Sequence, residues 1–91
     1  MKVLVLYQPR SEHRLTVEEL VREYKSQYPD STVQMLDVDQ PDGTALAKLY
    51  GVVRYPSIMV IKEDGGVIES WDGESELPRI EDINYYASSN I

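Results

Sequence analysis

Residues 36–73 of the chain read LDVDQPDGTALAKLYGVVRYPSIMVIKEDGGVIESWDG. Near the middle of this stretch, Ser57–Ile61 is a continuous apolar run, which is typical of a strand buried on both faces. Gly65 and Gly66 suit a tight turn, and a second run with β-forming residues follows at residues 67–71. The stretch therefore predicts an antiparallel hairpin.

The part of the stretch before the hairpin has the pattern of a strand, a loop and a short helix. Apolar residues mark a strand at residues 32–38, and residues 40–43 include Pro, Asp and Gly, which favour a loop. We predict a helix from about residue 44 to residue 50, which Gly51 closes.

Outward from this stretch, the N-terminal part of the chain predicts a strand at residues 3–7 and then a long amphipathic helix. Its apolar side chains recur at helical spacing, at Val17, Leu20, Val21, Tyr24 and Tyr28. The helix should end before Pro29. Its start is capped either by Ser11 or by Thr16, which has Glu19 at capping-box spacing.

At the other end of the chain, Ser75 is placed to cap a last helix with Pro78 in its first turn. The apolar side of this helix consists of Leu77, Ile80, Ile83 and Ala87. The element order β-α-β-α-β-β-α predicts an α/β sandwich of three layers, in which helices cover both faces of a four-stranded mixed sheet.

The chain has 91 residues, 42% of them hydrophobic and 27% charged, which fits a single folded domain over residues 1–91. Sixteen acidic against nine basic side chains give a formal net charge of −7, so nucleic acid and anionic membrane surfaces are repelled. The apolar runs are too short for a membrane span or a secretion signal. We expect a cytoplasmic monomer that binds neither nucleic acid nor membrane.

The chain contains no cysteine and a single histidine, His13. The lack of cysteine excludes disulfides, thiolate metal sites and thiol nucleophiles within this chain. A lone histidine excludes a metal centre built on several histidines. Ser11 and His13 are two residues apart, so on a helix they do not face each other as a hydrolase pair would. We therefore expect no cofactor and no metal.

Residues 36–73 resemble the second half of a thioredoxin. That family has a strand ending in Asp, a short helix ending in Tyr-Gly-Val, a cis-proline loop, an apolar strand, a glycine hairpin and a strand followed by Gly. This chain contains each of these features in the same order, whereas the rest agrees in layout only. The resemblance implies a thioredoxin-like fold of about glutaredoxin size, without the extra N-terminal strand and helix of full thioredoxins.

The resemblance also assigns individual positions near the family's active site. Pro56 matches the cis-proline, Tyr55 the residue before it and Ser57 the residue after it, and Gly73 matches the glycine near the active site. In the family, the residue before the cis-proline offers its backbone N–H and C=O to an extended substrate.

The redox motif of the family falls on residues 11–14, where both cysteines are missing. Ser11 stands in place of the nucleophilic thiolate, Arg14 in place of the resolving thiol, and Arg10 where tryptophan is usual. Val5 stands near the position of the buried carboxylate that assists proton transfer in many thioredoxins. The resemblance therefore implies a redox-inactive relative that is not a dithiol oxidoreductase.

Two functions fit these residues. The first is a protein- or peptide-binding module that uses the helix start and the cis-proline loop, with candidate residues Arg10, Ser11, His13, Arg14, Tyr55, Pro56 and Gly73. The second is a transferase-like enzyme that binds glutathione or another thiol through a hydrogen bond from Ser11. A structural subunit without a ligand also fits, with Ser11 only capping the helix and the arginines solvated.

The negative charge is concentrated in residues 62–82, which contain eight acidic and two basic side chains. This segment is either a docking face for a basic partner or a device for solubility that also protects an edge strand. Trp71, Tyr85 and Tyr86 form either an exposed contact cluster or part of the core.

Overall fold

The structure is a computed structural model that describes residues 1–88. In chain order the elements are β1 (Lys2–Tyr7), α1 (Arg14–Gln27), β2 (Val33–Asp37), α2 (Pro41–Tyr50), β3 (Ser57–Ile61), β4 (Val67–Asp72), the short 3₁₀ helix η1 (Glu74–Glu76) and α3 (Ile80–Ala87). The predicted β-α-β-α-β-β-α order is confirmed, with η1 as an addition. No helix in this part of the chain combines the length and apolar character that a membrane crossing needs.

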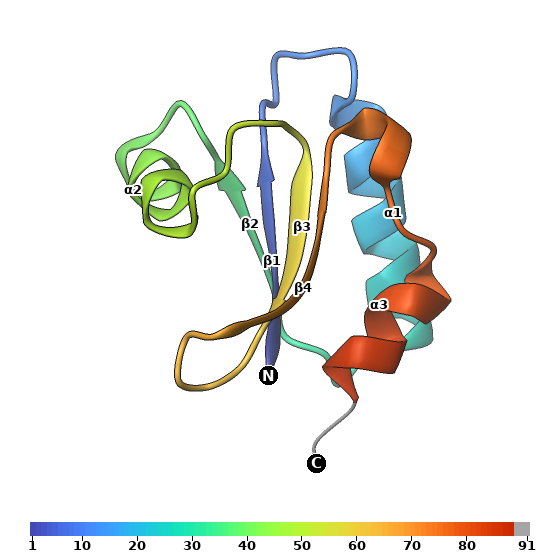
Figure 1. Ribbon diagram of the computed structural model, residues 1–91. Coiled ribbons are helices and arrows are strands. Elements are labelled where there is room, and N and C mark those ends of the chain that lie inside the picture. Colours follow the sequence, from blue (N-terminus) through green and yellow to red (C-terminus); the bar gives the residue numbers. More distant parts are fainter. Residues whose placement is uncertain (89–91) are drawn as a thin grey trace.

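The four strands form one mixed sheet in the order β2-β1-β3-β4 (Figure 1). β1 is parallel to β2 and antiparallel to β3, and β3 and β4 form the predicted antiparallel hairpin. In this register Val5 lies between Met35 and Ile58. The two continuous apolar runs are therefore the two central strands, as their lack of alternation predicts.

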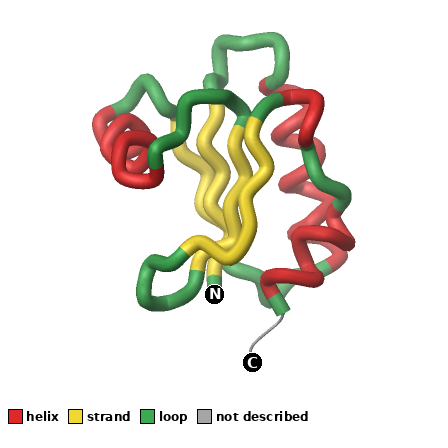
Figure 2. Tube along the Cα trace, viewed as in Figure 1, coloured by secondary structure: helices red, strands yellow, loops and turns green. Residues whose placement is uncertain are grey.

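Helices cover both faces of the sheet, α1 and α3 on one side and α2 on the other (Figure 2). Because side chains alternate along a strand, Val3 and Val5 face α1 and α3, whereas Leu4 and Leu6 face α2. All four are at most 2% exposed. The apolar stripe of α1 behaves as predicted, since its buried residues are Val17, Val21 and Tyr24.

The predicted caps of the first and last helices are wrong. α1 begins at Arg14 after His13, so Ser11 lies before the helix and Thr16 lies inside its first turn. The predicted cap of α3, Ser75, belongs to η1. α3 instead begins after Arg79, whose backbone N–H donates to a side-chain oxygen of Asp82 at 3.3 Å. A carboxylate in the first turn therefore replaces the expected serine cap.

α2 begins earlier than predicted, because residues 41–43 form its first turn rather than a loop. Pro41 fits there since the first helical residue needs no backbone N–H partner. Gly43 is buried where α2 meets the end of β2. A Cβ at this position would overlap the Asp37 carbonyl oxygen and lie 2.6 Å from its carbon, so glycine permits this close approach.

Candidate functional site

The connections that carry the predicted site residues lie at one end of the sheet. They are the β1–α1 loop, the α2–β3 loop and the turn after β4, drawn at the top of Figure 1. The strand register explains this grouping, because Ser57 at the start of β3 pairs with Leu6 near the end of β1 and with Asp72 at the end of β4.

The cis-proline loop is fastened to the turn after β4. The Tyr55–Pro56 peptide bond is cis, as the resemblance implied. The Pro56 C=O accepts a hydrogen bond from the Gly73 N–H at 2.8 Å. Beside it, the fully buried Ser57 donates its hydroxyl to a carboxylate oxygen of Asp72 at 2.6 Å. The structure thus brings Tyr55, Pro56 and Gly73 together.

Tyr55 has an anchored side chain and a free main chain. Its hydroxyl donates to the Val52 C=O at 3.3 Å, and its ring packs against the α2 side of the core. Neither its backbone N–H nor its C=O makes a hydrogen bond within residues 1–88. One donor and one acceptor therefore stand available directly before the cis-proline.

Arg54 covers Gly73 and was not predicted as a site residue. A Cβ on Gly73 would lie 2.7 Å from a terminal guanidinium nitrogen of Arg54 and 3.1 Å from its Cζ. Gly73 also has a φ of 94°, which favours glycine. No sequence motif marks Arg54, and its position directly before Tyr55 is the one signal that points to it.

The β1–α1 loop is closed by hydrogen bonds around Gln8. The Ser11 hydroxyl donates to the Gln8 C=O at 2.7 Å, and the Gln8 N–H donates to Nε2 of His13 at 3.2 Å. His13 is only 5% exposed. Because its proton is already donated to Gln8, the Ser11 hydroxyl is not free to donate to a thiol, which disfavours the thiol-activating alternative.

The two arginines of the loop differ in their surroundings. Arg10 is exposed, whereas Arg14 forms a 3.3 Å ion pair with Glu18 one helical turn away. Glu18 also lies near Tyr7 at the end of β1. Partial burial raises the pKa of Tyr7 first, the negative charges of Glu18 and Asp37 raise it further, and Arg14 lowers it.

The loop residues and the cis-proline loop remain separate groups at the same end of the sheet. Within residues 1–88, no hydrogen bond or ion pair joins residues 8–14 to residues 54–57 or to Gly73. The residues predicted as one site thus form two neighbouring surfaces. The cis-proline surface is the one held by hydrogen bonds between the start of β3 and the end of β4.

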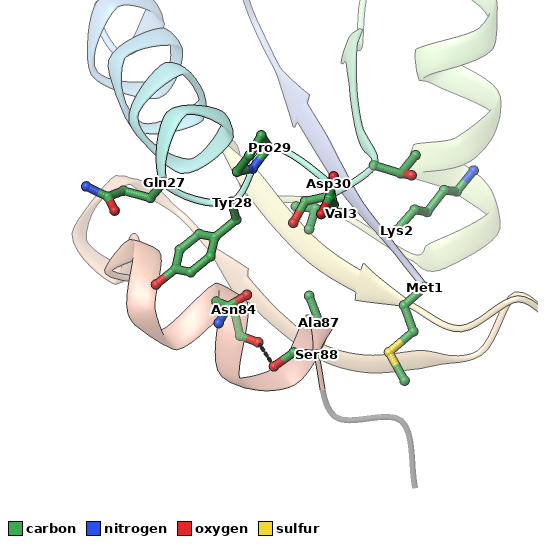
Figure 3. Close-up of a pocket in the computed structure, with 12 residues that line it drawn as sticks. Met1, Lys2, Val3, Gln27, Tyr28, Pro29, Asp30, Asn84, Ala87 and Ser88 are labelled. Atoms are coloured by element: carbon green, nitrogen blue, oxygen red, sulfur yellow. Dashed lines mark hydrogen bonds between the residues drawn. The ribbon is translucent and has the colours of Figure 1, made fainter.

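A pocket of about 410 Å³ lies at the opposite end of the sheet (Figure 3). It is enclosed by the start of β1, the α1–β2 connection and the end of α3, and Tyr28 and Asn84 are among its lining residues. None of the predicted site residues contributes to it. Sequence reasoning missed this pocket because its residues come from three separate segments that share no motif.

Comparison with known proteins identifies the fold of this chain. No family model and no curated protein matches the chain. Among solved structures, the chain is similar to thioredoxin O2 from Arabidopsis thaliana in the oxidized state, with a TM-score of 0.70 and 15% sequence identity. The match covers 92% of this chain and 69% of that chain. The protein has a thioredoxin-like fold and contains no cysteine.

Proposed function

We propose that this protein is a redox-inactive thioredoxin-like domain that binds an extended segment of a protein or peptide at its cis-proline end. The observation that carries the proposal is the main chain of Tyr55, whose N–H and C=O have no partner within residues 1–88. An extended peptide that lies beside Tyr55 can accept from the N–H and donate to the C=O. This is recognition by strand addition, and it needs no thiol.

The residues around Tyr55 suit such a ligand. The cis-proline loop is held by the Pro56–Gly73 and Ser57–Asp72 hydrogen bonds, so little ordering entropy is lost when a peptide binds. Val53, two residues earlier, is 84% exposed and offers apolar contact.

The start of α1 adds positive charge at the same end of the sheet. Arg10 is exposed there and forms no ion pair within residues 1–88, Arg14 is exposed but paired with Glu18, and the positive end of the helix dipole adds to the charge of Arg10. We therefore expect a preference for peptides with an acidic residue. Binding is non-covalent and reversible, because the chain has no cysteine to form a mixed disulfide.

The experiment is selection of peptides from a displayed random library, followed by NMR titration of the selected peptides into the labelled protein. We expect the amide resonances of Tyr55, Ser57 and Gly73 to shift on binding. N-methylation of the peptide residue that donates to Tyr55 should abolish binding. Selected peptides that shift only amides around the pocket of Figure 3 would contradict the proposal.

Charge reversal supplies a matched pair of variants. Arg14→Glu should weaken binding of an acidic peptide, because it replaces a positive side chain at the helix start with a negative one. Arg22→Glu makes the same change on an exposed position of α1 two turns further along and should have a smaller effect. Equal losses from the two variants would indicate long-range charge alone and would count against recognition at the helix start.

A further inference from the structure

Three aromatic side chains form a ladder on the side of the molecule where β4 meets α3. The Trp71 and Tyr86 rings have centroids 5.8 Å apart, and those of Tyr86 and Tyr85 are 5.0 Å apart, each pair packed edge to face. Trp71 and Tyr86 are half-buried against the core, whereas Tyr85 is 69% exposed. The ladder thus runs from the core to the surface.

Negative charge without a cationic partner lies beside the ladder. Glu69 lies two residues before Trp71 on β4 and so shares its face of the sheet, and Asp82 lies one helical turn before Tyr85 and Tyr86 on α3. The charge of Glu69 accordingly raises the pKa of Tyr86 most, and Asp82 adds to the same effect. Neither Glu69 nor Asp82 takes part in an ion pair within residues 1–88. Each carboxylate accepts one backbone hydrogen bond, Glu69 from Ser70 at 3.0 Å and Asp82 from Arg79 at 3.3 Å.

An exposed aromatic ring next to carboxylates that have no cationic partner is suited to bind a cation. A guanidinium can stack on a ring face while its N–H groups donate to a neighbouring carboxylate. The surrounding segment strengthens this preference, because residues 62–82 contain eight acidic and two basic side chains. Among residues 1–88, β4 is an edge strand with no partner on its outer side, so a partner chain can approach along that edge.

We propose that the aromatic ladder, together with Glu69 and Asp82, binds arginine side chains in a basic segment of a partner protein. The ladder lies on an open strand–helix surface, and its aromatic residues do not line the pocket of Figure 3, so a peptide fits it better than a small enclosed ligand. This surface shares no residue with the cis-proline site and therefore adds a second recognition function to the one proposed above.

The test uses a synthetic peptide of alternating glycine and arginine, with a peptide of glycine and citrulline as the neutral control. Trp71 is the single tryptophan of the chain, so its fluorescence and its indole N–H resonance report binding directly. We expect saturable binding of the arginine peptide with a shift of the Trp71 indole resonance. The citrulline peptide should not bind, because citrulline has nearly the same shape without the charge.

Three variants distinguish binding by the aromatic ladder from attraction by the net negative charge of the protein. Tyr85→Leu should weaken binding by about two- to fivefold, the range for an exposed cation–π contact, and Glu69→Gln should weaken it by up to about fivefold through loss of an exposed ion pair. Glu63→Gln removes the same charge from the exposed hairpin turn and should leave binding nearly unchanged. Circular dichroism checks that each variant is folded.

Two results would overturn the proposal. The first is equal binding of the arginine and citrulline peptides, or no saturable binding of either. The second is an equal loss of affinity in Glu69→Gln and Glu63→Gln with no loss in Tyr85→Leu. That result would mean that net negative charge, and not the ladder, attracts the arginine peptide.

Discussion

Substitution of His13 should destabilise the protein to an extent that depends on whether the new side chain accepts a hydrogen bond. His13 is 5% exposed, and its Nε2 accepts the Gln8 N–H at 3.2 Å. His13→Ala removes this acceptor and leaves the partly buried Gln8 donor without a partner. In His13→Gln the side-chain oxygen lies the same number of bonds from Cβ as Nε2, so it can replace the acceptor.

The expected magnitudes follow from these two roles. An unsatisfied buried donor costs about 1–3 kcal/mol, and loss of the packed ring adds to this, so His13→Ala should lower the free energy of unfolding by about 2 kcal/mol or more. For a domain of this size that corresponds to a fall in Tm of roughly 8–16 °C. His13→Gln should recover about 1 kcal/mol of the loss.

Urea unfolding of the parent and the variants measures these differences, and hydrogen exchange of the Gln8 amide locates them. His13→Asn is the matched control, because its oxygen lies one bond closer to Cβ and does not reach Gln8. Equal stability of His13→Asn and His13→Gln would contradict this role of Nε2, and so would equal exchange rates of the Gln8 amide in the parent and in His13→Ala.

Three further predictions concern the elements that hold the site. Gly43→Ala should destabilise the protein by about 1–3 kcal/mol in urea unfolding, although alanine favours helix, because the new Cβ would overlap the Asp37 carbonyl. A neutral or stabilising result would contradict that close approach. Ser57→Ala should cost about 1–3 kcal/mol through loss of its bond to the Asp72 carboxylate, and unchanged stability would contradict this. The pKa of Tyr7 is raised above the usual tyrosine value of 10.0, so its contribution to stability is present below pH 10.0 and is lost as pH rises through the folded-state pKa. Above pH 10.0, Tyr7→Phe should therefore lose less stability than the parent.

The strands were predictable because their apolar runs have a direct physical cause. Residues 3–7 and Ser57–Ile61 are apolar at consecutive positions since β1 and β3 are covered on both faces by helices. The hairpin was predictable for a local reason as well, because two adjacent glycines suit its turn.

Helix starts were less predictable because neither α1 nor α3 uses a Ser or Thr cap. α1 follows His13, whose ring makes no cap bond and accepts from Gln8 earlier in the chain, and the N–H of Arg79 before α3 donates to Asp82. The start of α2 was missed for a different reason. Proline favours both a loop and the first position of a helix, so Pro41 alone does not decide between the two.

The site was predictable only where the resemblance assigned positions along a continuous stretch. The cis bond before Pro56 follows from that stretch, whereas the cover of Arg54 over Gly73 depends on two loops that meet only in the folded chain. The same holds for the contact between Trp71 and Tyr86, which lie on different elements. Spacing along the sequence carries no information about such contacts.

Hydrogen bonds hold the cis-proline end in place although the chain has no cysteine. The Pro56 C=O is bonded to Gly73, Ser57 to Asp72, and the β1–α1 loop is closed around Gln8, so each loop is held without a disulfide. These hydrogen bonds keep the shape of the surface without a covalent crosslink. Reducing agents should therefore leave peptide binding unchanged.

The two proposed surfaces should respond to mutation independently. They share no residue, and their charges differ in sign, since the helix start carries Arg10 and Arg14 and the ladder carries Glu69 and Asp82. Arg14→Glu should therefore leave the affinity for the arginine peptide within about twofold of the parent, and Glu69→Gln should do the same for a peptide selected at the cis-proline end. If each substitution weakened both ligands equally, the two surfaces would be one site. Retained independence would mean that this small domain can hold two partners of opposite charge at once.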